Sequence, residues 1–252
     1  MATGKSVTDV RRLDVMRVAV DVLDEEQLSS AIDDLVAKDG VAQIALIRWW
    51  DFMRARRDRS YRACLRDADL VIPVSKSIVF AARFLRRRRP HRYMPFDFVI
   101  RVLGALEQRS RSVYLLGGSA PALRTVEQNL RETFPGLRFV GRYTGYYGKH
   151  VEPDIITAIR KANPDFVLVG AGAPGGDRWV ARHRSRLSPS VFLYSSEVFD
   201  IFSERRARGS RTAFKRGLDF VPDLLRRPWR GLRLFVYLWF LLTLGIFKLF
   251  RL

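Results

Sequence analysis

The chain has 252 residues, of which 45 are Lys or Arg and 26 are Asp or Glu, so its formal net charge is +19. With 48% hydrophobic residues, the chain is long and apolar enough to bury a core, which excludes intrinsic disorder of the whole chain. The excess of positive charge predicts attraction to a polyanion, such as a nucleic acid, an anionic lipid or a phosphate-bearing substrate.

Cysteine and histidine are scarce in this sequence. Cys64 stands alone and the three His show no ligand spacing, which excludes a disulfide scaffold and a structural zinc site. The N-terminal stretch has no apolar run and does not resemble a secretory signal, so we expect a cytoplasmic location.

Strand and helix patterns alternate along most of the chain at the spacing of an α/β domain. Short apolar runs predict buried strands, and amphipathic stretches predict helices. Their repetition predicts a doubly wound, mostly parallel, Rossmann-like sheet with helices on both faces. In chain order the expected segments are strand Gln43–Ile47, helix Tyr61–Asp67, strand Ala68–Pro73, helices Ile78–Arg88 and Phe96–Glu107, strand Ser112–Gly118, helix Ala120–Phe134, strand Arg138–Val140, helix Pro153–Ala162, strand Phe166–Gly170, helix Asp177–Arg186 and strand Val191–Tyr194.

Two glycine-rich loops, Gly117–Ser119 and Gly170–Asp177, follow expected strands, where open α/β sheets bind their ligands. The second loop is out of register with the G-x-G-x-x-G fingerprint, and no acidic residue ends the next strand. A nicotinamide cofactor is therefore not expected. Asp67-Ala68-Asp69 matches D-x-D but lies at the start of a strand, so nothing in the sequence requires a metal.

The C-terminal region combines a basic stretch with an apolar tail. Ten Lys or Arg and three acidic residues lie between Glu204 and Arg233, ahead of an uncharged run from Leu234 to Phe247. We expect an α/β domain over residues 1–203 and a basic appendage over 204–252, whose segment 234–250 associates with an anionic membrane surface. The alternatives are a C-terminal helix packed on the domain's own core and a short, tilted membrane span.

Six segments occur in the order and at the spacing of a known family. They read ADLVIP with SIVFAAR, RYMPFD, VYLLGG, GRYTGYY, NPDFVLVGAGAPGGDRWVARHRSRL and RGLDFVPDLLRRPWR. Together, over roughly Ala45 to Arg233, they resemble the bacterial glycosyltransferase family named for WecG, TagA and CpsF. The resemblance implies transfer of a sugar from a nucleotide diphosphate donor to a lipid-linked acceptor.

The sequence departs from the family pattern at four polar positions. The P-D-G aspartate, which the resemblance implies as general base, is replaced by Val74, and the family glutamine by Gly176. A threonine-any-asparagine segment falls on Leu46–Arg48, and an arginine near the C-terminus falls on Asp223. The chemistry therefore has to rest on the polar residues that remain.

The remaining polar residues suggest a set of roles. Asp97 is the candidate general base, and an ion pair with Arg92 or Arg101, or capping of a helix, is the structural alternative. Arg92, Arg230 and Arg233 are expected to bind a diphosphate or the acceptor's phosphate, although solvated or lipid-facing arginine is as good an interpretation. The residues expected to bind the nucleotide sugar are Gly117, Gly118, Gly172, Pro174, Asp177 and Tyr146.

Three functional hypotheses follow from these patterns. The first is a glycosyltransferase at the cytoplasmic face of the cell membrane, held peripherally or monotopically through its C-terminus. The second is a catalytically impaired family member that acts as a membrane-associated scaffold or partner of an active transferase. The third is nucleic-acid binding by a basic protein, which is not expected to be specific because no recognition motif accompanies the arginines. Oligomeric state has no usable signal.

Overall fold

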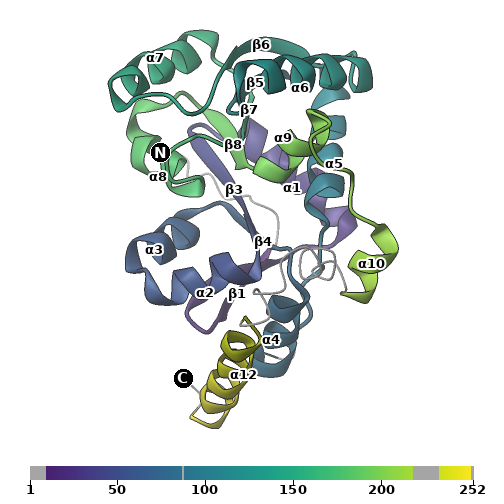
Figure 1. The fold of residues 1–252 in the computed structure, drawn as a ribbon, viewed down its shortest axis with the longest axis vertical. Helices are drawn as coiled ribbons and strands as arrows, with labels where there is room; N and C mark the ends of the chain where they lie inside the picture. The colour runs from purple at the N-terminus through teal and green to yellow at the C-terminus, as the bar shows by residue number, and fades with distance from the viewer. Residues whose placement is uncertain (1–9, 87, 218–232, 251–252) are drawn as a thin grey trace, which may run out of the picture.

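Six parallel strands form one sheet, in the order β4-β3-β8-β7-β5-β6 (Figure 1). The computed structural model describes residues 10–86, 88–217 and 233–250. All of these strands except the edge strand after Leu137 are almost wholly buried and apolar, as suits strands that are covered on both faces. The strands are β3 (Val41–Ile47), β4 (Leu70–Pro73), β5 (Ser112–Leu116), β6 (Arg138–Tyr143), β7 (Phe166–Val169) and β8 (Ser190–Tyr194), preceded by the antiparallel pair β1 (Arg11–Val15) and β2 (Val18–Val22).

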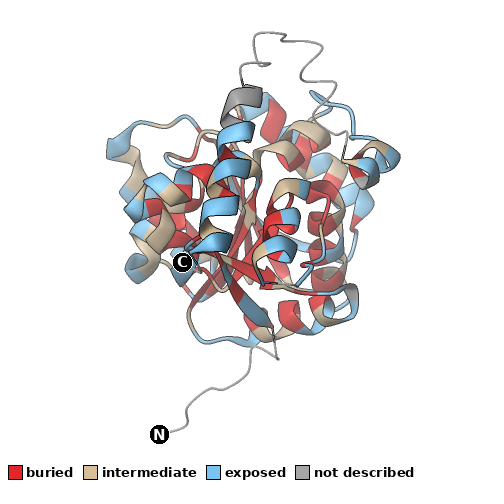
Figure 2. Ribbon diagram, turned by 90° about the horizontal axis from the view of Figure 1, so that it is seen from below, coloured by how far each residue is buried: buried red, intermediate tan, exposed pale blue. Residues whose placement is uncertain are grey.

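Helices cover both faces of the sheet, so the predicted doubly wound α/β fold is confirmed. Figure 2 shows the buried residues gathered along the sheet and on the sides of the helices that face it. The helices are α1 (Glu25–Ala37), α2 (Trp49–Arg57), α3 (Arg59–Asp67), α4 (Lys76–Arg86), α5 (Pro95–Glu107), α6 (Ala120–Thr133), α7 (Glu152–Ala162), α8 (Asp177–His183), α9 (Ser196–Phe202), α10 (Arg211–Arg216) and α12 (Arg233–Leu249), with short 3-10 turns at Lys149–Val151 and Arg184–Arg186.

Alternating side chains of each strand enter different core layers, as the two-residue period of a strand requires. In β5, Val113 and Leu115 pack with α1, α5, α6 and α9, whereas Tyr114 and Leu116 pack with α7 and α8. A further cluster holds Ala45 and Ile47 of β3 against α2, α3, α4 and α12.

The hairpin of β1 and β2 covers one edge of the sheet. Its two turn residues, Met16 and Arg17, both have positive φ, which is the geometry of a two-residue hairpin loop. The buried carboxylate of Asp21 accepts a hydrogen bond from the backbone N–H of Val71 in β4 at 2.7 Å and receives two 2.8 Å bonds from Arg12. The edge of β4 is therefore occupied by protein. No strand was expected over this hairpin from the sequence.

The last helix, α12, packs beside α4 at the lower end of the molecule in Figure 1. Phe240 and Leu244 are buried in the same cluster as Phe52 of α2, and Tyr237 and Phe247 lie against it. These four side chains follow the spacing of one helical face. Among the helices that the structure describes, none is long and apolar enough to cross a membrane. The division of the chain at residue 203 stays a prediction.

Candidate functional site

The carboxyl ends of β5 and β7 adjoin, and their loops lead to opposite faces of the sheet. After β5 the chain turns into α6, and after β7 it turns into α8, which packs in the other core layer. A crevice between such diverging loops is the usual ligand site of an open parallel sheet. Both glycine-rich loops singled out in the sequence lie at this edge.

The predicted glycines bring the two loops into contact. Gly117 has φ of +133°, and a Cβ atom there would lie 2.7 Å from the Cα of Gly170. The N–H of Gly118 donates to the carbonyl oxygen of Ala171 at 2.7 Å. A Cβ at Gly172 would lie 2.4 Å from the backbone nitrogen of Tyr146. At these positions the missing side chains therefore allow backbone-to-backbone packing.

Tyr146 lies at the same edge of the sheet and has an unusual backbone conformation. Its side chain is 72% exposed and its φ is +58°, a conformation that non-glycine residues rarely adopt. Strain of this kind persists where the surrounding structure enforces it and is commonest at functional sites. An exposed ring held in this way is suited to stacking on a base or a sugar. Nearby, the carbonyl oxygen of Pro174 accepts a hydrogen bond from Arg182.

The first residue of α8, Asp177, lies inside the protein. Its carboxylate accepts a hydrogen bond from the hydroxyl of Tyr61 at 3.2 Å, while the other oxygen, Oδ1, is buried without a hydrogen-bond partner. Burial raises the pKa of Asp177 to about 7. Its predicted contact with a nucleotide sugar stays a prediction, whereas its contact with Tyr61 belongs to the core.

At the end of β4, the position expected to hold the family's aspartate is apolar. Val74 is 5% exposed and packs with Met94 and Phe214, with Leu46 alongside. Arg92 donates to the carbonyl oxygen of Val74 and to that of Phe214, both at 2.6 Å. Its guanidinium also lies 3.6 Å from the centre of the Phe214 ring. The predicted phosphate ligand Arg92 therefore lies at the strand-end site and ties α10 to it.

Asp97, the candidate base, lies in the first turn of α5, where a carboxylate is favoured by the helix dipole. Its Oδ2 pairs with Nε of Arg211 at 3.0 Å, and its Oδ1 pairs with Arg208. Asp97 therefore does form an ion pair, but the expected partners, Arg92 and Arg101, were wrong, because the arginines that contact it lie ahead of and within α10.

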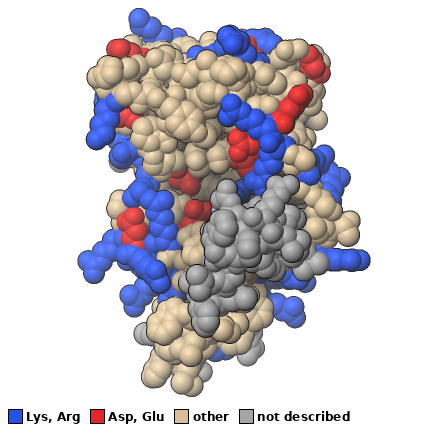
Figure 3. Space-filling model, in the orientation of Figure 1, with Lys and Arg blue, Asp and Glu red and all other residues tan. Residues whose placement is uncertain are grey.

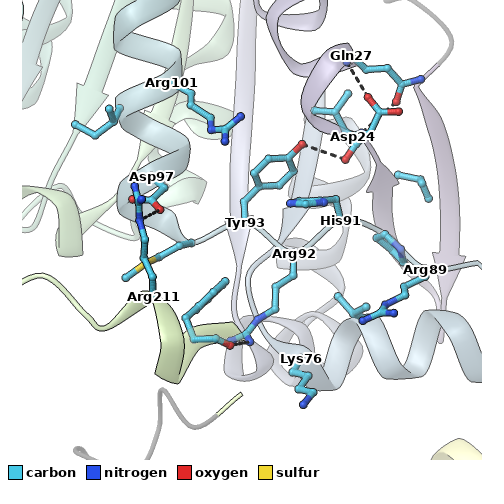
Figure 4. A pocket seen from close by; sticks show the side chains of 17 residues that line it. Asp24, Gln27, Lys76, Arg89, His91, Arg92, Tyr93, Asp97, Arg101 and Arg211 are labelled. Carbon is cyan, nitrogen blue, oxygen red and sulfur yellow. Dashed lines mark hydrogen bonds and ion pairs between the residues drawn. The ribbon is translucent and has the colours of Figure 1, made fainter. Parts of the chain in front are cut away.

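A cavity of about 830 Å³ lies beside Arg92 and Asp97, between α4, α5, α10 and the start of α1 (Figure 4). More basic than acidic groups line it, which favours an anionic occupant. Lys76 also donates to the carbonyl oxygen of Arg216 at 2.9 Å. The charged lining residues are Lys76, Arg89, Arg92, Arg101 and Arg211, with the carboxylates of Asp24 and Asp97.

Sequence reasoning missed most of this cavity. Arg89 belongs to the run of arginines that begins at Arg86, which is ordinarily solvated, and Arg211 lies over a hundred residues away in sequence. The available signal for Arg89 was the run of arginines at the end of α4, a few residues before Arg92.

An ion pair joins the ends of two neighbouring strands, β3 and β8. Arg48, which stands where the resemblance places an asparagine, pairs with Glu197 in the first turn of α9. The Arg48 side chain is 46% exposed and that of Glu197 only 13%. Sequence reasoning did not single out Glu197, which follows the last expected strand.

Several predicted positions cannot be placed. Arg230 and Asp223 lie outside the described residues, and Arg233 opens α12 with its side chain outside the description. Among the residues that are described, no group of three His, Cys, Asp or Glu side chains is arranged to hold a metal ion.

The fold and the site define a doubly wound α/β protein with an anion-favouring cavity near the carboxyl edge of its sheet. The pattern of the Glycosyl transferase WecG/TagA/CpsF family matches residues 13–251, and the chain belongs to that family.

Curated relatives share one activity. The chain is 24% identical over 182 residues to the N-acetylglucosaminyldiphosphoundecaprenol N-acetyl-beta-D-mannosaminyltransferase of Bacillus subtilis (strain 168), covering 71% of this chain and 70% of that protein. It is 23% identical over 180 residues to the enzyme of the same name from Bacillus spizizenii (strain ATCC 23059 / NRRL B-14472 / W23), covering 71% and 69% of the two chains. For that from Staphylococcus aureus (strain NCTC 8325 / PS 47), identity is 19% over 167 residues, covering 66% and 65%.

Proposed function

We propose that the chain transfers a sugar from a nucleotide diphosphate donor to a polyprenyl-phosphate-linked acceptor in the synthesis of a bacterial surface polysaccharide. The observation that carries this proposal is the cavity lined by five basic side chains, which adjoins the strand-end contact of Arg92 with Val74. Both substrates carry diphosphate, and an excess of positive charge close to the crevice of a doubly wound sheet suits such groups.

The proposed step is an inverting transfer. An acceptor hydroxyl forms a bond to the anomeric carbon of the donor sugar while the bond from that carbon to the diphosphate breaks. Asp97 takes the hydroxyl proton, and Arg92, with Arg230 and Arg233, stabilises the departing nucleoside diphosphate. Because both oxygens of Asp97 hold arginines, the acceptor has to displace Arg208 or Arg211 to reach the carboxylate.

The proposed location is the cytoplasmic face of the cell membrane, with peripheral or monotopic attachment through the C-terminus. Support comes from α12, which carries apolar side chains on its outer side as well as on its packed side. A helix that is apolar all round is normally buried, so its outer side suits a lipid surface.

The test is transfer of radiolabelled sugar to lipid-linked acceptor by the purified protein, starting with the substrates in the relatives' name. We expect transfer by the wild type and a loss of about 100-fold or more in kcat for Asp97→Asn, since general bases contribute at least that much. Asp39→Asn, at an exposed carboxylate, is the matched control. Unchanged kcat in Asp97→Asn would remove Asp97 from the mechanism.

A second candidate is a non-catalytic, membrane-associated partner of an active transferase. Two contacts favour it: Val74 fills its position with apolar packing, and Arg48 is neutralised by Glu197. Two results together would favour the non-catalytic partner over the transferase. The wild type would show no detectable transfer over a range of sugar donors, and it would still bind the lipid-linked acceptor.

A further inference from the structure

Large apolar side chains are exposed mainly at one end of the molecule. Of the twelve exposed large hydrophobic residues among those described, nine lie on α4, on α12 or directly after α12. In Figure 1, α4 and α12 project side by side from the lower end, and in Figure 3 that end is largely tan with Lys and Arg above it. They are Phe80, Phe84, Leu238, Trp239, Leu241, Leu242, Ile246, Leu249 and Phe250.

The contribution of α4 is an aromatic pair that the core does not use. Phe80 and Phe84 are 47% and 40% exposed, and their rings stack with centroids 6.1 Å apart. One helical turn places these two residues on the same side of α4. The opposite side of α4, including Ile78 and Ala82, is fully buried.

One side chain joins this aromatic pair to α12. Lys248 donates from Nζ to the carbonyl oxygen of Phe84 at 2.8 Å and lies 5.4 Å from the centre of the Phe84 ring. The exposed apolar residues of the two helices therefore belong to one surface. We call this surface, made by Phe80, Phe84 and the outer side of α12, the α4–α12 face.

We propose that the α4–α12 face inserts into an anionic bilayer, with Phe80 and Phe84 as a second membrane element beside the C-terminal helix. This proposal rests on the proposed function in one respect: a lipid-linked acceptor makes a lipid surface the expected binding partner of the α4–α12 face.

The charges on α4 and α12 favour an anionic lipid surface over a second copy of the chain as the binding partner of this face. Neither α4 nor α12 contains an acidic residue, whereas Arg83 and Arg86 on α4 and Lys248 on α12 are exposed. Arg56 reaches α12 as well, with its guanidinium 5.5 Å from the ring centre of Phe247. Two such faces would bring like charges together, while anionic head groups neutralise them.

The same helix connects this face to the cavity. α4 begins two residues after Val74, and its Lys76 and Val79 line the cavity. Insertion of Phe80 and Phe84 would therefore bring the cavity close to the lipid head groups, where the diphosphate of a lipid-linked acceptor lies.

Vesicle sedimentation of the full chain tests the proposal. The vesicles contain phosphatidylcholine alone or with phosphatidylglycerol, and the variant is Phe80→Ser/Phe84→Ser. We expect stronger binding to the anionic vesicles and about a tenfold loss of partition for the variant, from the apolar area withdrawn from the interface. Val140→Ser, at an exposed valine on β6, is the matched control and should bind as the wild type.

A direct probe guards against indirect effects of the double substitution. Phe84→Cys, labelled with an environment-sensitive dye, should shift its emission to the blue on anionic vesicles, whereas labelled Val140→Cys should not. The native thiol, Cys64, is 5% exposed and does not compete for the label.

The outcomes separate the alternatives. Wild-type binding by Phe80→Ser/Phe84→Ser alongside loss in Leu238→Ser/Leu242→Ser would restrict insertion to α12 and overturn the proposal. Conversion of a dimer to a monomer by the α4 variant, without change in partition, would identify a second copy as the occupant and also overturn it. Transfer to a short-chain acceptor in solution is measured separately, so failure of the proposed function is distinguishable from failure of membrane insertion.

Discussion

Arg92 donates a hydrogen bond from Nε to the carbonyl oxygen of Val74, so the predicted phosphate ligand contacts the residue at the expected position of the family's base. A second hydrogen bond, from Nη1 of Arg92 to the carbonyl oxygen of Phe214, extends the contact to α10. One guanidinium therefore joins the end of β4 to the start of the C-terminal region. In addition to its proposed contact with substrate, Arg92 therefore stabilises the packing of α10 against the end of β4.

Arg92→Lys should weaken this junction. A lysine keeps the charge but cannot reach two carbonyl groups and cover the Phe214 ring at the same time. We expect the free energy of unfolding to fall by about 1–3 kcal/mol and proteolysis near α10 to accelerate. Arg89→Lys, which changes the same residue type in the same cavity, is the control for urea unfolding. Equal losses in both variants would contradict a special role for Arg92.

Asp21→Ala should be among the most destabilising single changes. The Asp21 side chain is 1% exposed, and its removal leaves the N–H of Val71 without its acceptor. It also takes the carboxylate partner from Arg12, which keeps only backbone carbonyl acceptors. Because Arg12 is 35% exposed, the main cost is the buried N–H left without an acceptor and the lost charge-assisted bonds, about 2–3 kcal/mol. Thermal and urea unfolding should show this loss, whereas Asp67→Ala, which breaks the exposed pair with Arg66, should change stability by less than about 1 kcal/mol.

Gly117→Ala should disrupt the strand-end loops. The new Cβ would meet the backbone of Gly170 at 2.7 Å in a conformation that L-residues rarely adopt. We expect a loss of stability of about 2–4 kcal/mol. Gly104→Ala in α5 has open space and helical geometry, and it should stabilise the protein by about 0.5–1 kcal/mol. The measurement is denaturant unfolding, in which the free energy of unfolding should fall for Gly117→Ala and rise for Gly104→Ala.

Asp177 should make stability depend on pH. Its folded-state pKa of about 7 lies above its ordinary value of 3.8, so the folded state binds the proton more tightly than the unfolded state. The stabilising contribution is complete below about pH 4 and is lost as the pH rises through about 7, amounting to about 4 kcal/mol.

The variant Asp177→Asn carries no titrating group at this position. Its stability relative to the wild type should therefore rise with pH across that window, in denaturant unfolding at a series of pH values. Asp39→Asn, at an exposed carboxylate, should show no such trend. A flat difference for Asp177→Asn would mean that the wild-type carboxyl titrates normally.

The sheet was largely readable from the sequence, because buried parallel strands are continuous apolar runs. β5 falls inside the segment expected at Ser112–Gly118, and helix α6 matches its expected span to one residue. Some ends differ: β6 continues to Tyr143, and α8 ends at His183 in a 3-10 turn where a longer helix was expected.

The hairpin and α2 offered weaker signals. The hairpin turn, Met16-Arg17, lacks the Asn or Gly that usually marks positive φ, and the residue before α2, Arg48, is not a typical helix cap. For α1 a signal was present: Asp24 and Gln27 form a capping box.

The candidate site depended on contacts that no local pattern encodes. Arg92 meets Phe214, and Asp97 meets Arg208, across more than a hundred residues of chain. The glycine-rich loops follow β5 and β7 where they were expected, and the binding of a nucleotide sugar by Gly117 and Gly172 stays a prediction. Sequence alone does not distinguish a glycine that faces a phosphate from one that faces another backbone, as these two do. The sequence showed the departures from the family pattern at Val74 and Arg48. It did not show the residues that contact them, Met94 and Glu197.

The packed side of α12 bears on how the protein should be handled in the laboratory. Deleting this helix to remove its apolar surface would also strip Phe240 and Leu244 from the cluster that holds Phe52 of α2, and would leave part of the hydrophobic core open to water. Polar substitutions confined to the outer positions of α12 keep that cluster closed. They are the better route to a form that stays in solution without detergent.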